Sequence, residues 1–418
     1  MTIKPKMRLP SLLPRWATDV DATLDPPEEL KDTGWQPEFF DPARIKNWLS
    51  NLAYEWIRRI GSQVLSNFHT VTDFTFSGGT DLLDIGYWPD YKKFYIVDID
   101  GRIYLNDTDY VWSDTPSKEM GEELVEAGYR YFPKPIAYRS NSLIFGTVSG
   151  KLWYYAYPYD GWLFEPESTV GGSGAITAMD TSYRVDDTKI IATRSNVTTT
   201  GIRICTNSIS TPWVAPSTPP TGTIIRIIKV LHVYASTWFI LGLDGVTSAA
   251  NVTLHKSIDD GDTWEAIPVD WTVVNFYGMD IEYSPDTGTL IMSGRPKDNP
   301  RTHAAMWSTD QGDNWEFSTI TQSDVVEVSV SSVGSILQHC GGSYWIATKH
   351  MSQGVSTVDL YPSYFLSCDD GVTFEQINID VDTPIDAGAL AISCDNQKIH
   401  LIGREGFHAV SQAVVLEE

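Results

Sequence analysis

The sequence predicts an all-β fold, a β-propeller of seven blades with six as the alternative, on the basis of three observations. A skeleton of the form Ser-x-Asp-x-Gly-x-Thr-Trp occurs three times, and its aspartates, Asp259, Asp310 and Asp369, are 51 and 59 residues apart. That spacing is the length of one four-stranded blade with its loops. From residue 68 onward apolar and polar residues alternate with period two, and 31 glycines and 23 prolines punctuate the chain. Both features favour strands and turns over helices.

Each copy of the skeleton predicts a tight turn followed by a strand. The aspartate can accept hydrogen bonds from the amides of its own turn, the glycine can adopt the positive φ that closes it, and the aromatic residue begins the next strand. The second copy has Asn314 where the other two have threonine, and the third has Phe374 in place of tryptophan. The residues that define the three turns are Ser257, Asp259, Gly261, Trp264, Ser308, Asp310, Gly312, Trp315, Ser367, Asp369, Gly371 and Phe374.

These three stretches resemble the Asp-box, or bacterial neuraminidase repeat, of sialidase-like β-propellers. The resemblance implies a hairpin at the outer side of each blade, between its third and fourth strands. In that family the box is structural and lies away from the catalytic centre. We therefore expect these residues to hold the blades together, in preference to the alternative of a ligand site in the boxes themselves.

The charge of the chain is divided unevenly between two segments. Residues 1–66 contain nine basic and nine acidic residues, so the whole net charge of −24 falls on residues 67–418, with 21 basic and 45 acidic residues. An acidic body of this kind repels DNA and anionic membranes. The sequence therefore predicts an N-terminal arm with a docking helix over 1–66 and a propeller over 67–418, without direct nucleic-acid binding.

Neither a metal site, nor a cofactor, nor membrane insertion is predicted. The four cysteines lie far apart, with no C-x-x-C pair and no nearby histidine cluster, which argues against a disulfide framework and a zinc site. The N-terminus lacks the roughly 7–15-residue apolar core of a secretion signal, and no run of about 18 apolar residues occurs. We expect a protein that is made in the cytoplasm.

The N-terminal arm is irregular, proline-rich and rich in large aromatic side chains such as Trp35. One amphipathic helix is predicted after it, over residues 41–60, with an Asp-Pro start and a glycine stop. Its apolar stripe includes Trp48, Leu52 and Trp56. We expect these three side chains and Trp35 to dock on a partner, and the alternative is that they pack on the chain's own propeller.

Three runs of this N-terminal segment, residues 13–19, 26–35 and 42–49, contain a Gly-Trp pair followed by Pro-Ala-x-x-x-Asn-Trp-Leu. Their order resembles the N-terminal segment of tailed-bacteriophage virion proteins, especially tail-fibre-like ones, although Asp41 stands where that pattern usually has proline. The resemblance implies a structural component of the phage particle, tail-associated and fibre-like or adhesive, present in several copies. Its residues 1–66 would bind other virion proteins. The propeller would contact another protein, or a glycan or receptor on the host surface, and the mature chain would reside in the virion.

Short strands are predicted in order from residue 68. The first blade is expected at residues 82–88, 94–98, 102–105 and 110–112. Asp98 and Asp100 flank its Asp-Gly hairpin, where turn formation is favoured over acid–base chemistry. The second blade holds a dense aromatic cluster, in which Trp153, Tyr155 and Trp162 are candidates for stacking on a glycan, with burial between blades as the commoner alternative.

The last strands of the chain are expected to be completed by its first. Residues 389–393, 398–403 and 408–415 give three strands, so we expect residues 68–76 to supply the fourth and close the ring. Before each box lies a long loop on the inner part of its blade, and such loops on a rigid scaffold are where binding is expected. These loops are residues 243–253, 295–303 and 349–362.

No catalytic residue is predicted, and the chain is expected not to be an enzyme. Sialidase-like enzymes use an arginine cluster, a tyrosine with a glutamate, and an acid–base aspartate at the ring centre, and their aromatic-Arg-Ile-Pro signature is absent here. The nearest fragment, Tyr138-Arg139-Ser140, lacks the Ile-Pro. A sialidase-like glycan hydrolase or lectin remains the alternative to a structural or receptor-binding phage protein.

Overall fold

The computed structural model shows an all-β chain built from antiparallel sheets. It describes residues 68–70, 82–88, 93–107, 112, 116–124, 135–139, 142–156, 161–165, 174–182, 189–194, 201–206, 212–222, 224, 226–244, 251–267, 269, 274–299, 302–322, 332–352, 363–377, 389–395, 398–403 and 408–411. Within these residues there is no α-helix, and hence no helix that could cross a membrane. The predicted arm over 1–66 and the helix over 41–60 lie outside them.

The described strands form seven sheets, which we number in chain order. Sheets 1 to 3 contain β2 (Leu82–Trp88), β3 (Lys93–Asp98), β4 (Arg102–Asn106) and β5 (Lys118–Glu119); β6 (Ile136–Arg139), β7 (Ser142–Gly146), β8 (Leu152–Ala156) and β9 (Gly161–Glu165); and β10 (Ile176–Thr181), β11 (Lys189–Arg194) and β12 (Arg203–Thr206). Sheets 4 and 5 contain β13 (Arg226–Tyr234), β14 (Thr237–Leu243), β15 (Val252–Ser257) and β16 (Glu265–Ala266); and β17 (Tyr277–Tyr283), β18 (Leu290–Arg295), β19 (Ala304–Ser308) and β20 (Glu316–Phe317).

Sheets 6 and 7 each include a strand from elsewhere in the chain. Sheet 6 contains β22 (Ser332–His339), β23 (Trp345–Ser352), β24 (Ser363–Ser367) and β25 (Thr373–Ile377), with β21 (Thr319–Thr321) parallel to β25. Sheet 7 contains β26 (Ala389–Asp395), β27 (Lys398–Gly403) and β28 (His408–Ser411), with β1 (Phe68–Thr70) at its edge.

Burial follows the position of a strand within its sheet. The second strands β7, β14 and β18 are buried along their whole length, whereas the fourth strands β16 and β20 are exposed. A strand with neighbouring sheets packed on both its faces has no solvent side, so its sequence is a continuous apolar run and not an alternating one. The sheets therefore pack face to face, with their fourth strands at the rim.

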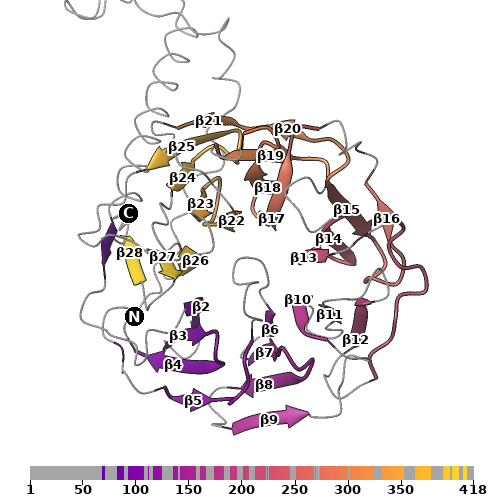
Figure 1. The fold of residues 1–418 in the computed structure, drawn as a ribbon, viewed down its shortest axis with the longest axis vertical. Coiled ribbons are helices and arrows are strands. Elements are labelled where there is room, and N and C mark those ends of the chain that lie inside the picture. The colour runs from indigo at the N-terminus through magenta and orange to yellow at the C-terminus, as the bar shows by residue number, and fades with distance from the viewer. Residues whose placement is uncertain are drawn as a thin grey trace, which may run out of the picture.

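Figure 1 shows the sheets arranged as a ring around a common centre, with β2, β6, β10, β13, β17, β22 and β26 innermost. Inner strands of neighbouring sheets lie close together, from β6 through β10, β13, β17, β22 and β26 to β2. Apolar clusters lie between neighbouring sheets from sheet 1 through sheet 6 and between sheets 7 and 1; between sheets 4 and 5, for example, Phe239 packs with Ile281 and Met292. This is the arrangement of a β-propeller.

The ring is closed by pairing the two ends of the described chain. Strand β1 runs antiparallel to β28, with Phe68 opposite Ser411 and Thr70 opposite Ala409. The predicted closure is confirmed for these three residues of β1, whereas residues 71–76 lie outside the described part. Sheet 7 thus gains the fourth strand that its own segment lacks, and β1 covers the edge that β28 would otherwise expose.

Two sequence expectations need correction. The fourth strand of sheet 1 is β5 and not residues 110–112, because the indole of Trp112 is buried in the cluster with Tyr104 and Ile402 instead of continuing the alternation of a strand. Cys340 is disulfide-bonded, although no disulfide framework was expected, while Cys205 and Cys368 carry free thiols.

Candidate functional site

The first of the repeated turns, residues 257–264, is held by a closed set of hydrogen bonds. Ser257 Oγ donates to Asp259 Oδ1 over 2.8 Å and accepts from the amide of Gly261 over 2.9 Å. Asp259 also accepts from the amide of Thr263 through Oδ1 (2.8 Å) and from its hydroxyl through Oδ2 (2.5 Å). Trp264 Nε1 donates to the carbonyl of Gly261 over 2.7 Å. One serine and one aspartate thereby accept from the amides of Gly261 and Thr263 within the turn.

The second and third turns reproduce this network with different side chains. Asn314 replaces threonine, and its Nδ2 donates to Asp310 Oδ2 over 2.6 Å, as the threonine hydroxyl does elsewhere. Trp315 Nε1 donates to the carbonyl of Gly312 over 2.9 Å. Phe374 has no ring N–H, and the third turn keeps the ring only as a fully buried apolar group. The departures seen in the sequence therefore leave the aspartate's hydrogen bonds intact.

Hydrogen bonding sets the charge state of the turn aspartates. Burial raises the pKa of Asp259, but hydrogen bonds from Thr263 and Ser257 outweigh this effect and lower the pKa below its usual value. The pKa of Asp310 is lowered in the same way, with Asn314 as the main donor. Both groups are ionised acceptors at neutral pH, which suits a fixed structural role.

The glycine of each turn is required by its backbone and by its surroundings. Its φ is 86°, 85° and 81° in the three copies, and the preceding residue also has positive φ. A Cβ at any of the three would come within 3.0 Å of a side chain on the preceding sheet. The side chains met are Ile191 for Gly261, Phe239 for Gly312 and Ile291 for Gly371. The turns therefore pack one sheet against the next.

Two of the turns also bind the chain segment that arrives from the preceding sheet. Thr218 pairs in parallel with Thr263, and Thr319 pairs in parallel with Thr373. Ser217 adds hydrogen bonds from its amide and hydroxyl to Asp262. The structure brings the four residues of each turn together, and each turn packs on the preceding sheet.

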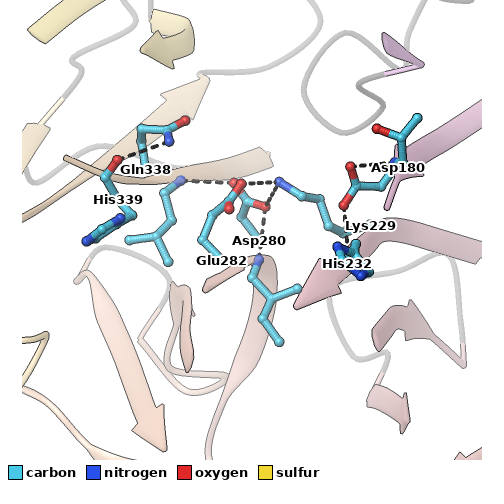
Figure 2. Close-up of polar contacts among 10 residues, drawn as sticks. Asp180, Lys229, His232, Asp280, Glu282, Gln338 and His339 are labelled. Carbon is cyan, nitrogen blue, oxygen red and sulfur yellow. Dashed lines mark hydrogen bonds and ion pairs between the residues drawn. The ribbon is translucent and has the colours of Figure 1, made fainter. Parts of the chain in front are cut away.

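The ring centre holds a cluster of charged residues that sequence reasoning missed. Figure 2 shows Lys229 of β13 facing Asp280 and Glu282 of β17, with Nζ at 3.1 Å and 2.6 Å from their carboxylate oxygens. Asp280 Oδ2 also accepts from the amide of Leu337 on β22 over 2.9 Å. Burial acts to lower the pKa of Lys229, but the two carboxylates outweigh it and raise that pKa. The cluster joins three consecutive inner strands.

Asp180 makes a similar contact one sheet earlier. Its Oδ2 accepts from the amide of His232 on β13 over 2.6 Å, and its Oδ1 accepts from the amide of Thr181 (Figure 2). Burial raises the pKa of Asp180 to about 7, and the hydrogen bonds from His232 and Thr181 oppose this shift. Carboxylates on β10 and β17 thus each accept from a backbone amide of the next inner strand.

A second recurring motif, His-x3-Ser-x-Trp, spans the hairpin between the first and second strands of sheets 4 and 6. The two copies begin at His232 and His339 and end at Trp238 and Trp345. In each, the histidine Nε2 lies at 3.1 or 2.9 Å from a turn carbonyl, and its ring lies 4.7 or 4.8 Å from the tryptophan ring. The indole Nε1 donates to the side chain of the aspartate directly after the turn aspartate. This residue is Asp260 in sheet 4 and Asp370 in sheet 6. This pattern was visible in the sequence as a repeat of 107 residues.

The acid pair at the first hairpin forms a turn. Asp98 Oδ1 accepts from the amides of Asp100 (3.1 Å) and Arg102 (2.8 Å), and Oδ2 accepts from the hydroxyl of Tyr104 (3.3 Å). Burial raises the pKa of Asp98 to about 6, against the opposing effect of Arg102. The carboxylate of Asp98 therefore accepts hydrogen bonds from the backbone amides of its own turn.

The predicted binding aromatics fall in different environments. Tyr155 is 1% exposed and belongs to the core cluster shared by sheets 1 and 2, so it is a core residue and not a stacking platform. It is buried because the second sheet has a neighbour on the face toward which this side chain points. Trp153 is partly buried and packs against the same cluster. The side chain of Trp162, and all of Trp35, Trp48, Leu52 and Trp56, lie outside what the structure describes.

The repeated turns and the long loops lie on opposite faces of the ring. The amides of Asp260 and Asp370 donate to carbonyls in the hairpins between the first and second strands, at Ser236 and Ser343. Since strands alternate in direction, the loops between second and third strands emerge on the other face. There Lys297 Nζ donates to Asn251 Oδ1 over 2.8 Å and joins the loops of sheets 4 and 5. Across the described residues, no group of three metal-ligating side chains occurs.

Comparisons with known proteins identify the fold. No family model and no curated protein matches this sequence. Among solved structures, YCF48 from Cyanidioschyzon merolae has a TM-score of 0.52 at 12% identity, over 83% of this chain and 98% of that one. A GH74 xyloglucanase from Xanthomonas campestris has 0.51 at 12% identity, over 83% and 54%, and the WD40 repeats of RRP9 have 0.50 at 11%, over 83% and 97%. These likenesses establish a β-propeller and nothing about its activity.

Proposed function

We propose that this chain is a structural, adhesion-type component of a tailed-phage particle. Residues 1–66 attach it to other virion proteins, and residues 67–418 form a seven-bladed Asp-box propeller that is displayed for contact with a protein or the host surface. The observation that carries the proposal is the separation of the chain into a neutral, tryptophan-rich arm of phage-like sequence and a body that carries the whole charge of −24.

The architecture of the described residues is consistent with such a division. The chain enters the ring at β1, which lies at the edge of sheet 7 beside β28. An arm that precedes β1 is therefore joined to the sheet that closes the ring, so a pull on the arm acts on a strand held by antiparallel hydrogen bonds. Seven sheets, with β1 as the fourth strand of the last, support seven blades over six. The three hydrogen-bonded turns support their identity as Asp-boxes.

We propose binding and not turnover as the role of the propeller. Lys229 is engaged by Asp280 and Glu282, and Asp180 by backbone amides, so these ring-centre charges already have structural partners. The alternative, a sialidase-like hydrolase or lectin, predicts release or binding of sialic acid. Release from a fluorogenic sialoside, abolished by Glu282→Gln, would establish the hydrolase; we expect none.

The proposal is tested on the full-length chain in particle assembly. Trp48→Ala, Leu52→Ala and Trp56→Ala should each weaken attachment by about 1–4 kcal/mol, because a docking helix draws its affinity from a few large apolar anchors. Arg58→Ala, on the charged side of the same helix, is the matched control and should incorporate normally. Equal incorporation of all four variants, measured by quantitative blotting of purified particles, would rule out this helix as the anchor.

A further inference from the structure

Arg295, the last residue of β18, is a buried cation with no carboxylate partner among the residues that the structure describes. The residue is 5% exposed, and its Nε is buried and has no hydrogen-bond partner. Within the described part of the chain, Nη1 donates to the carbonyl of the adjacent Pro296 over 3.3 Å. The guanidinium carbon lies 4.7 Å from the centre of the Tyr277 ring, which faces it across the β17–β18 pair. Among the described residues, no ion pair includes it.

Such a group is energetically unfavourable when nothing compensates its charge. Burying a cation removes it from water, and only an opposite charge or several hydrogen bonds offset that cost. Burial accordingly lowers the pKa of Arg295, and Tyr277 alone opposes the shift. A stack on one aromatic ring offsets part of this cost, but leaves the planar edge of the guanidinium without an acceptor.

The loop that begins at Arg295 is a basic segment in an acidic body. Residues 295–303 contain three basic residues and one acidic residue. Residues 67–418 as a whole contain 21 basic and 45 acidic residues. The corresponding loop of sheet 4, residues 243–253, has one acidic and no basic residue, and that of sheet 6, residues 349–362, has one of each. By sequence, the loop 295–303 is therefore the most basic of the three long loops.

We propose that Arg295 binds the carboxylate of a ligand at the base of the loop 295–303. A guanidinium donates two parallel N–H bonds that match the two oxygens of a carboxylate. One buried cation is neutralised by one monovalent anion, so a carboxylate fits better than a phosphate dianion. The carboxylate of the ligand would thereby accept hydrogen bonds from the guanidinium edge of Arg295. This inference concerns the propeller alone and does not depend on residues 1–66.

Arg194 provides a matched control within the same chain. It is the last residue of β11, the equivalent strand of sheet 3, and it is 4% exposed. Its Nη2 donates over 3.2 Å to the carbonyl of Gly150, in the hairpin between β7 and β8 of sheet 2. Arg194 thus links neighbouring sheets, whereas the one hydrogen bond of Arg295 returns to the next residue. Substitution should affect stability at Arg194 and ligand binding at Arg295.

The test measures the melting temperature of the full-length chain against carboxylate concentration, at constant sodium concentration with chloride as the reference anion. The probes are sodium acetate, N-acetylglutamate and N-acetylneuraminate, which separate a simple, a peptide-like and a sugar carboxylate, with sodium phosphate as a further arm. We expect a saturable rise in melting temperature with at least one carboxylate. Arg295→Met should abolish that rise without lowering the melting temperature in chloride, because it removes an uncompensated buried charge.

Two further variants keep the outcome interpretable. Arg295→Lys retains the charge but loses the paired donors, so it should fold and bind the same carboxylate about tenfold more weakly. Arg194→Met should lower the melting temperature in chloride and keep the carboxylate-dependent rise. The proposal is overturned if the wild type shows no carboxylate-dependent rise, if phosphate alone produces one, or if Arg295→Met keeps it. It is equally overturned if Arg295→Met lowers the melting temperature in chloride as Arg194→Met does.

Discussion

A turn aspartate such as Asp259 accepts several hydrogen bonds from donors in its own turn. One of its oxygens accepts from a serine hydroxyl and an amide, and the other accepts from the threonine hydroxyl two residues beyond the turn glycine. The same bonds recur at Asp369, and at Asp310 the amide nitrogen of the Asn314 side chain takes the place of the threonine hydroxyl. At this scale the sequence was informative, because every donor lies within four residues of its acceptor and spacing alone predicts the contact.

Removing a turn aspartate should reduce stability and leave binding intact. Asp259→Ala, Asp310→Ala and Asp369→Ala should each lower the free energy of unfolding by about 1–3 kcal/mol, because turn amides lose their acceptor. Asp313→Ala, an exposed neighbour in the second turn, should change it by less than about 0.5 kcal/mol. Chemical denaturation with a common m-value provides the comparison. Loss of ligand or particle binding by folded Asp310→Ala would contradict a structural role.

Asp98 should make stability depend on pH in a defined window. Burial raises its pKa in the folded chain to about 6, from 3.8, so the folded state binds more protons than the unfolded state between these values. Stability therefore falls as pH rises through about 4 to 6, and this loss, about 3 kcal/mol at most, is fully present above pH 6. Asp98→Asn keeps the turn acceptor and has no such titration. The difference in unfolding free energy between variant and wild type should grow from pH 4 to pH 7. A constant difference would refute the prediction that Asp98 titrates with a raised pKa in the folded chain.

Elements meet one another through close approaches that only glycine permits. The turn of sheet 6 contacts β18 of sheet 5 at Gly371, where a Cβ would collide with Ile291. The repeated turns that mark the third-to-fourth connections were predictable from the sequence, whereas the second strands are buried along their whole length and are not the alternating strands that were expected. The fourth strand of sheet 1 was not predicted correctly, since the sequence around Trp112 has the pattern of a strand but the Trp112 side chain is buried outside one. The Lys229 cluster was also missed, because its members come together only when inner strands of different sheets adjoin.

The packing contribution of the turn glycine can be separated from its backbone conformation. Gly371 and Gly288 have φ of 81° and 78°, but a Cβ at Gly288 would meet nothing within 4 Å. Gly288→Ala should therefore cost only the left-handed strain, about 1–2 kcal/mol. Gly371→Ala should cost a further amount of about 1–3 kcal/mol from overpacking against Ile291. Equal losses in thermal or chemical unfolding would show that the turn does not pack on the preceding sheet.

At the scale of the whole molecule, the described residues form a closed ring, and β1 lies at the edge of the sheet that closes it. Local patterns predicted the ring because each blade repeats the same strand order and the last blade lacked one strand. They could not predict which carboxylates meet at the centre, or that Arg295 has no carboxylate beside it in the described part of the chain, since both depend on the juxtaposition of segments far apart in the sequence. The division between attachment by residues 1–66 and display by residues 67–418 is the central claim.

That claim is tested most directly by expressing residues 67–418 and offering them to particles assembled without the full-length chain. This segment retains β1 and so the closing pair with β28. We predict a cooperative melt and a soluble monomer that does not join particles, while the full-length chain does. Efficient incorporation of residues 67–418, or their failure to fold without the arm, would contradict the account.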